Sequence, residues 1–274
     1  MTPNAENQNA IADATPANLL SVNSVTKHFP IETGFFHNAG FMAAVQDVSF
    51  SMRPGRITAV VGESGSGKTT LARMIQGLLP VTQGEILAEG KNINTLNRRE
   101  RARFSQMVFQ DPFASLNPKL SVGTMLEEAV RQNMEQTSIK GDIPETISKL
   151  LSSVGLPDNI LKDYPHQFSG GQRQRLGIAR ALALSPKLII ADEPVSALDL
   201  SIQSQILNLL LDLNETGGIA ILLIAHDLSV VRKMADDVLV MKDGRVAEQG
   251  PAQKIFAKPE DPYTQKLLSA ALTL

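Results

Sequence analysis

Short apolar runs alternate along the chain with stretches whose apolar residues recur at helical spacing. The apolar runs are Ile57 to Val61, Ser105 to Phe109, Leu188 to Ala191 and Ile219 to Ala225. Runs of this length, bounded by turn residues, are typical of strands that are buried on both faces. Because strands that alternate with helices form parallel sheets, the pattern predicts an α/β protein with a buried sheet.

Five stretches carry the apolar spacing of amphipathic helices. They are Leu71 to Leu79, Val122 to Asn133, Ile143 to Val154, Gln172 to Leu184 and Ile202 to Glu215. Gly217 and Gly218 follow the last stretch and are expected to end that helix, because glycine tolerates the left-handed conformation found there. Two shorter helical patterns lie around Ile255 and Leu267.

Other segments alternate more weakly and predict an antiparallel layer. The expected strands of this layer are Leu19 to Phe29, Ala43 to Met52, Gly84 to Leu87 and Lys91 to Ile93. Pro30 to Gly40 is expected to be a loop between the first two. Asp243-Gly244 separates Val238 to Met241 from Arg245 to Glu248, and a dipeptide of this type predicts a hairpin.

Composition and hydrophobic pattern divide the chain into a tail, one main domain and a C-terminal segment. Residues 1–17 are polar and rich in Asn and Ala, so we expect a disordered tail and neither a signal peptide nor a transit peptide. Residues 18–250 are expected to form the main domain. Within it, residues from about 112 to 165 turn polar and helical, which indicates an inserted helical subdomain. Residues 251–274 are expected to form a helical tail.

Composition excludes several classes of function. With 43% apolar residues, the 274 residues are ample for a buried core. A net charge of −2, no Trp and 4% aromatic residues give little to attract or stack nucleic acid, so no nucleic-acid partner is expected. The absence of Cys excludes disulfides and thiolate-held metals. No apolar run approaches the ~20 residues that span a bilayer, so a membrane connection requires a partner.

One stretch carries a specific chemical signal. The sequence Gly62-Glu63-Ser64-Gly65-Ser66-Gly67-Lys68-Thr69-Thr70 follows an expected strand and opens an expected helix. We call Gly62 to Thr69 the phosphate loop. Its glycines let backbone N–H groups approach a polyphosphate, and the helix start adds unpaired donors and positive potential. Lys68 is expected to reach the β- and γ-phosphates and Thr69 to ligate Mg²⁺.

Polar residues follow three other buried strands. Asp192 and Glu193 follow Ala191, His226 follows Ala225, and Gln110 follows Phe109. Ligands of open α/β sheets sit beyond the carboxyl ends of strands, so these side chains are expected to converge on one nucleotide.

Each of these side chains has an expected role in phosphate chemistry. Asp192 would bind the metal or its water, and Glu193 would activate the attacking water. His226 would hold the γ-phosphate and that water, while Gln110 would complete the metal shell or sense the γ-phosphate. Simpler readings stay open: the two carboxylates can cap a helix, His226 can be bonded by backbone groups, and Gln110 can be a turn residue.

A second glycine turn, Ser169-Gly170-Gly171-Gln172, opens the helix that ends near Leu184. A helix start of this kind is also able to bind an anion. One chain does not need two such anion-binding glycine turns for one triphosphate. The second turn is therefore expected to close over a nucleotide held by another subunit.

The order of these motifs resembles the ATP-binding-cassette (ABC) ATPases from about Leu19 onward. Ser196-Ala197-Leu198-Asp199 belongs to the same pattern. The segments from Phe109 to Pro118, Tyr164 to Ser169 and Asp261 to Thr264 resemble one subfamily, the ATPase subunits of oligopeptide, dipeptide and nickel importers. The serine at position 196 of this motif and the aromatic loop before Val45 resemble the second, F-type subunit of such importers.

The resemblance implies a P-loop ATPase core with an N-terminal antiparallel β layer and an inserted helical subdomain. It implies ATP and Mg²⁺ as ligands and a head-to-tail dimer with a second ATPase subunit, either a copy of this chain or a homologous one. Phe29 would stack on adenine, with Phe35, Phe36 and Phe41 as rivals, and Asp199 would lie at the dimer seam or cap the following helix.

The same resemblance implies partners and a location. The partners are transmembrane permease subunits and, indirectly, a substrate-binding protein, and the location is peripheral, on the cytoplasmic face of the inner membrane. Peptide import is the leading expectation, with nickel, antimicrobial-peptide or polyamine transport as alternatives for the cargo.

Two other classes of protein are alternatives to a transport ATPase. A small-molecule kinase would use the phosphate loop but would leave the turn from Ser169 to Gln172 without a role. A soluble ABC ATPase of DNA or ribosomes would carry either long coiled coils between Lys68 and Ser169 or a second cassette, and this chain has neither.

Overall fold

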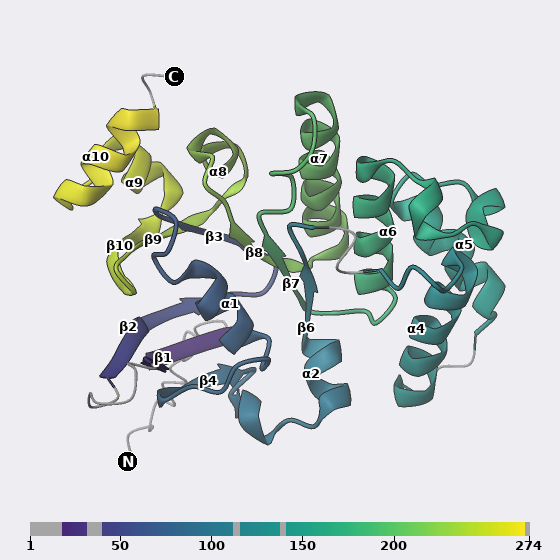
Figure 1. Ribbon diagram of the computed structural model, residues 1–274, viewed down its shortest axis with the longest axis horizontal. Coiled ribbons are helices and arrows are strands. Elements are labelled where there is room, and N and C mark those ends of the chain that lie inside the picture. The colour runs from purple at the N-terminus through teal and green to yellow at the C-terminus, as the bar shows by residue number, and fades with distance from the viewer. Residues whose placement is uncertain (1–17, 32–39, 112–115, 138–140, 272–274) are drawn as a thin grey trace, which may run out of the picture.

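The chain folds into two β-sheets with helices packed around them, as the computed structural model in Figure 1 shows. The structure describes residues 18–31, 40–111, 116–137 and 141–271. The expected disordered tail, the aromatic residues Phe35 and Phe36, the first residues of the expected helical insert and the last three residues of the chain lie outside these ranges.

The first sheet is antiparallel, with the strand order β2-β1-β4-β5. Its strands are β1 (Leu20–Ile31), β2 (Gly40–Met52), β4 (Gln83–Ala88) and β5 (Lys91–Asn92). The predicted antiparallel layer is therefore confirmed. The first two strands run further than expected, into the segment predicted as a loop from Pro30 to Gly40, because Pro30 and Ile31 pair with Phe41 and Gly40.

The second sheet has the strand order β10-β9-β3-β8-β7-β6. Its strands are β3 (Ile57–Val61), β6 (Ser105–Val108), β7 (Leu188–Asp192), β8 (Ala220–Ile224), β9 (Asp237–Lys242) and β10 (Arg245–Pro251). The pairs from β9 through β3, β8 and β7 to β6 are all parallel, as predicted. The carboxyl ends of β3, β8 and β7 therefore lie side by side at one edge of this sheet.

The alternation of side chains divides the core into two clusters on the two faces of the parallel sheet. In β7, Ile189 and Ala191 pack in the cluster that includes the helical region, while Leu188 and Ile190 pack in the cluster that includes the antiparallel sheet. Every residue of β3, β7 and β8 is buried. This explains why these strands read as continuous apolar runs rather than alternating ones.

Nine α-helices and three 3₁₀ helices are present among the described residues. The α-helices are α1 (Lys68–Ile75), α2 (Arg98–Phe104), α4 (Val122–Thr137), α5 (Ile143–Ser153), α6 (Gly170–Leu182), α7 (Leu200–Gly217), α8 (Leu228–Met234), α9 (Ala252–Ala257) and α10 (Pro262–Ala271). The 3₁₀ helices are η1 (Ile93–Thr95), η2 (Asp158–Lys162) and η3 (Pro165–Gln167). The helices α2 and α8 were not predicted.

The helix after the phosphate loop is shorter than predicted. It ends at Ile75 and not at Leu79, because Gly77 adopts φ +71°, a left-handed conformation that terminates helices. The predicted end of α7 is confirmed, since Gly218 adopts φ +63° after the last turn.

The helices α4, α5 and α6 lie together at one end of the molecule, beyond β6, in Figure 1. Pairs of them are in contact with one another, and Val122, Leu126 and Leu151 are fully buried between them. The helical character predicted for this region is confirmed. The boundaries at 112 and 165, and the division of the chain into three parts, stay predictions.

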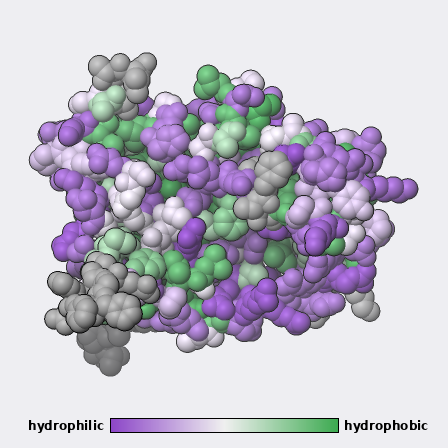
Figure 2. Space-filling model, in the orientation of Figure 1, coloured by the Kyte–Doolittle hydropathy of each residue, from purple (hydrophilic) through white to green (hydrophobic). Residues whose placement is uncertain are grey.

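The molecular face drawn in Figure 2 is mostly hydrophilic, with small separate hydrophobic patches. The large apolar side chains most exposed among the described residues are Phe41, Met42, Leu78, Tyr164 and Leu200. None of the described helices combines the length and apolar character needed to cross a bilayer.

Candidate active site

The phosphate loop connects the central strand β3 to α1 and is packed too closely for side chains at two of its glycines. A Cβ atom on Gly62 would overlap the carbonyl oxygen of Met241 in β9, and one on Gly67 would overlap that of Ala44 in β2. Both glycines have positive φ, +146° and +100°. These positions therefore need glycine for space and for backbone conformation, whereas Gly65 has open space around it and needs glycine only for its φ of +82°.

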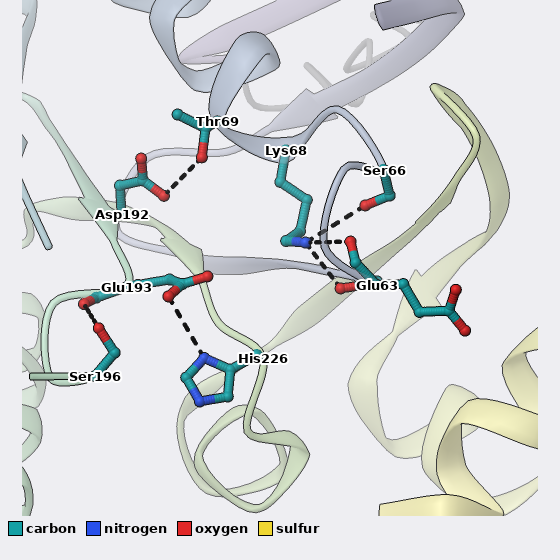
Figure 3. Close-up of polar contacts among 9 residues, drawn as sticks. Glu63, Ser66, Lys68, Thr69, Asp192, Glu193, Ser196 and His226 are labelled. Atoms are coloured by element: carbon teal, nitrogen blue, oxygen red, sulfur yellow. Dashed lines mark hydrogen bonds and ion pairs between the residues drawn. The ribbon is translucent and has the colours of Figure 1, made fainter.

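Lys68 is folded back over the loop (Figure 3). Its Nζ donates to the carbonyl oxygens of Gly62 and Glu63, both at 2.8 Å, and to Ser66 Oγ at 3.4 Å. Burial lowers the pKa of the Lys68 ammonium, and the nearby Glu193 and Asp192 carboxylates oppose this effect. The ammonium group of Lys68 is thus held against the backbone of the loop. Negatively charged phosphate oxygens of a bound nucleotide would compete favourably with these carbonyl oxygens for its hydrogen bonds.

Thr69 and Asp192 form the oxygen pair predicted for Mg²⁺. Thr69 Oγ1, in the first turn of α1, donates to Asp192 Oδ1 at the end of β7 at 3.3 Å. Asp192 is 8% exposed, and its burial raises the pKa of the carboxyl, although the hydrogen bond from Thr69 works in the opposite direction. A hydroxyl and a carboxylate are hard oxygen ligands of the kind Mg²⁺ prefers, so the pair fits this ion.

Glu193 is held in an uncommon backbone conformation directly after β7. Its φ is +47°, in the left-handed region that non-glycine residues rarely adopt. The Glu193 N–H donates to the Ile224 carbonyl of β8 at 3.0 Å, and the Glu193 carbonyl accepts from the Ser196 hydroxyl at 3.2 Å. The peptide groups on both sides of the residue are therefore fixed, and the direction of its side chain is fixed with them.

His226 follows β8 and lies beside Glu193, with 3.6 Å between His226 Nδ1 and Glu193 Oε2. Figure 3 shows Lys68, Asp192 and Glu193 around one open space, with His226 at its rim. The side chains of Glu193 and His226 are 26% and 63% exposed, so water reaches both. Of the four strand ends predicted to converge, those of β3, β7 and β8 lie side by side; that these groups and Gln110 meet on one nucleotide stays a prediction. The alternative that Asp192 and Glu193 cap a helix is wrong, because the next helix begins only at Leu200.

Gln110 and Phe29 belong to two other strands, since Gln110 follows β6 and Phe29 lies on β1. Gln110 is exposed just beyond β6, the edge strand of the parallel sheet. Phe29 lies on β1, where Lys27 Nζ is 5.3 Å from the ring centroid. Its rival Phe41 is 69% exposed and 6.2 Å from the His28 ring. The roles of Gln110 in the metal shell and of Phe29 in adenine stacking stay predictions.

The second glycine turn opens α6, as predicted, and Ser169 is its N-cap. Ser169 and Gln172 exchange capping hydrogen bonds, with Gln172 N donating to Ser169 Oγ at 3.4 Å and Ser169 N donating to Gln172 Oε1 at 3.0 Å. Gly170 packs on Leu198 and Gly171 on Ile202, so both glycines allow the approach of α7 and its preceding loop. In Figure 1, α6 and α1 lie on opposite sides of β6 and β7.

Asp199 occupies the N-cap position of α7. This helix begins at Leu200, two residues before the start predicted at Ile202. Its carbonyl accepts from Ile202 N and Gln203 N, at 2.9 Å and 2.8 Å. Its side chain makes no capping hydrogen bond. The alternative that the Asp199 side chain caps the following helix is therefore wrong, and its place at the dimer seam stays a prediction.

Two residues that sequence reasoning did not place in the site hold the phosphate loop from outside. Gly244 N donates to the Ser66 carbonyl at 3.1 Å, and Glu63 N donates to the hydroxyl of Tyr263 at 3.1 Å. In the sequence, Tyr263 belongs only to the segment Asp261 to Thr264 that resembles the importer ATPases, and no periodicity connects it with a loop 200 residues away. A phosphate loop on the central parallel strand β3, with paired carboxylates at the end of β7, separated from β3 by β8 alone, defines a phosphate-loop nucleotide-binding protein of the α/β class.

Comparison with known proteins narrows this class. A family model described as ABC transporter matches residues 45–196. The probable peptide ABC transporter ATP-binding protein y4tS of Sinorhizobium fredii is 52% identical over 257 residues, which cover 92% of this chain and 72% of that protein. The oligopeptide transport ATP-binding protein OppF of Lactococcus lactis subsp. lactis is 43% identical over 256 residues, which cover 92% of this chain and 80% of that protein. The chain belongs to the ABC transporter family.

Solved structures agree with this result. The chain matches cbiO1 of Clostridium perfringens, part of the ABC transporter complex cbiONQ, with a TM-score of 0.72 and 28% identity, covering 88% of this chain and 92% of that one. It also matches a dimeric post-hydrolysis state of the ATP-binding cassette MJ0796 bound to ADP and Pi, with a TM-score of 0.72 and 28% identity. This match covers 85% of this chain and 98% of that one. The predicted fold class is confirmed. The chain carries an ABC ATPase domain, so its nucleotide is ATP and its reaction is ATP hydrolysis.

Proposed function

We propose that this chain hydrolyses Mg²⁺-bound ATP to drive a peptide importer, as the energy-coupling subunit on the cytoplasmic face of a membrane. The observation that supports the chemistry best is the grouping at three neighbouring strand ends of Lys68, the Thr69–Asp192 pair and Glu193 with His226. The peptide cargo is proposed from the relatives, which are described as peptide and oligopeptide transport proteins.

In this proposal the chain's residues divide the work on the triphosphate. Backbone N–H groups from Gly62 to Thr70 and the Lys68 ammonium bind phosphate oxygens. Thr69 and Asp192, with Gln110, hold the Mg²⁺, which when bound offsets negative charge on the phosphates. Each group acts from a position that the sheet and α1 fix before the nucleotide arrives, so little reorganisation is needed.

Glu193 and His226 act on the water. The Glu193 carboxylate accepts a proton from the water that attacks the γ-phosphate, and His226 holds that water and the γ-phosphate from the rim of the site. The fixed backbone on both sides of Glu193 supports this role, because a general base must be aimed within hydrogen-bond reach of its water.

The second glycine turn supports a head-to-tail pair of ATPase subunits. In Figure 1, α6, which this turn opens, lies across β6 and β7 from α1, which follows the phosphate loop of the same chain. In the proposal, Ser169 to Gln172 therefore close over the nucleotide of the other subunit. The relative described as dimeric is MJ0796, bound to ADP and Pi. Permease subunits are the proposed link to the membrane, and a substrate-binding protein acts through them.

The variant Glu193→Gln tests the catalytic part of the proposal. It keeps the shape of the side chain but removes the base, so we expect ATP turnover to fall by about two orders of magnitude or more while ATP affinity is kept. A matched control is Glu89→Gln, since Glu89 has the same φ of +47° but lies in the turn between β4 and β5. The measurements are phosphate release and calorimetric ATP titration. Phosphate release from Glu193→Gln close to that of Glu89→Gln would contradict the role of Glu193.

A further inference from the structure

The geometry points to Tyr263, in the C-terminal helix α10, as a positioning residue that holds the phosphate loop in its nucleotide-binding shape. This inference rests on the proposed function, because the loop matters only as a phosphate cradle. The contact is direct: the Glu63 N–H, in the loop, donates to the Tyr263 hydroxyl at 3.1 Å.

Glu63 is the point at which the loop is held on two sides. Its N–H is bound by Tyr263, and its carbonyl accepts from Lys68 Nζ at 2.8 Å and from Ser66 N at 3.2 Å. The two peptide planes that meet at Glu63 therefore cannot rotate without breaking one of these bonds. The orientation of these planes affects the direction of the following N–H groups and the position of Lys68.

Tyr263 is itself fixed from several directions. Its own N–H and that of Thr264 donate to Asp261 Oδ1, at 2.8 Å and 3.2 Å, so the carboxylate caps the start of α10. The Glu248 carboxylate in β10 accepts from the Glu260 and Asp261 N–H groups, at 2.9 Å and 3.1 Å. The helix start is thus tied to β10, and the tyrosine cannot follow the loop if the loop moves.

The surroundings of the ring suit a neutral hydroxyl that accepts a hydrogen bond. Lys242 Nζ, at the end of β9, lies 5.0 Å from the ring centroid of Tyr263, which adds a cation–π contact. Burial raises the pKa of the Tyr263 phenol, and the nearby charges of Glu63 and Asp243 act in the same direction, while the bond from the Glu63 N–H opposes them. The phenol therefore stays protonated at neutral pH.

A purely structural role for Tyr263 predicts something different. The ring also packs against the core cluster of the helical face. If packing were its only role, removing the hydroxyl would leave the loop and its ligand affinity unchanged. The substitution Tyr263→Phe separates the two cases, because it removes the acceptor and keeps the ring, its packing and its contact with Lys242.

The experiment compares Tyr263→Phe with wild type and with Tyr164→Phe, the other tyrosine of the chain. In the nucleotide-free protein, exchange of the Glu63 amide measured by NMR is expected to accelerate about fivefold, because one net hydrogen bond is lost. The Kd for Mg·ADP, measured by calorimetry, is expected to rise about three- to tenfold for the same reason. Tyr164→Phe is expected to match wild type in both measurements.

The two readouts keep this inference apart from the proposed function. Unchanged Glu63 exchange and unchanged Mg·ADP affinity in Tyr263→Phe would overturn the inference, and a lower melting temperature alone would show that the tyrosine only packs. Failure of wild type to bind Mg·ADP would refute the proposed function, and the exchange rate of Glu63 in the free protein would still decide whether Tyr263 holds the loop.

Discussion

Gly62 at the start of the phosphate loop allows a quantitative test of how closely this loop is packed. In Gly62→Ala the new methyl group would overlap the Met241 carbonyl oxygen of β9 and would lie 2.9 Å from Ser66 Oγ. The first contact is with backbone that pairs with β10 and β3, so the neighbour cannot move aside without disturbing the sheet. The loop itself must shift instead.

The expected cost has two parts. A non-glycine residue at positive φ costs about 1–2 kcal/mol. Forcing an extra methyl group into a packed site costs a further ~1–3 kcal/mol. We therefore expect Gly62→Ala to lower the free energy of unfolding by about 2–5 kcal/mol and, because the loop shifts, to weaken Mg·ATP binding as well.

The control isolates the conformational part. Gly90, in the turn between β4 and β5, has φ +78° and open space around its Cβ position, so Gly90→Ala carries the backbone cost alone. Urea unfolding of both variants gives the difference in free energy, and calorimetry gives the ATP affinity. Equal destabilisation by Gly62→Ala and Gly90→Ala, with ATP affinity unchanged, would refute the reasoning that β9 packs against the loop.

Two further substitutions address the second glycine turn and α8. Ser169→Arg is expected to leave ATP binding of the isolated chain intact and to depress hydrolysis in the assembled pair, measured by phosphate release; loss of binding in the isolated chain would contradict a role in trans. Asp227→Ala removes the cap of α8 and is expected to cost about 1 kcal/mol at neutral pH. Burial raises the Asp227 pKa, but hydrogen bonds from Ser229 outweigh it and leave the pKa lowered, so this stabilisation should fade in urea titrations as pH falls through that pKa.

The sheets could be predicted because their sequence signals are local. Continuous apolar runs marked β3, β7 and β8, and the polar residues after them marked the edge at which the site lies. The hairpin of β9 and β10 followed from Asp243-Gly244, and both residues adopt positive φ, +48° and +78°. The order of the strands did not follow from these signals, since pairing between distant segments is decided by the packing of the whole domain.

The missed helices show where local signals fail. Asn97 and Glu100 form a capping box at the start of α2, and Asp227 caps α8 through the Ser229 N–H, so both helices carry start signals in the sequence. Each helix has only seven residues, which is too short for a helical repeat of apolar positions to be recognised. Capping residues, rather than periodicity, were the usable signal for these two segments.

Glu193 links the fold to the chemistry more closely than any motif suggests. Glu89 shares its φ of +47°, but Glu89 and Gly90 form a two-residue hairpin turn in which positive φ is normal. Glu193 lies in no hairpin, and its conformation is maintained by the bonds to Ile224 and Ser196. Strain of this kind persists only where the surrounding structure fixes it. The strand end that buries Asp192, the proposed metal ligand, therefore turns sharply to direct the next carboxylate towards His226 and the solvent.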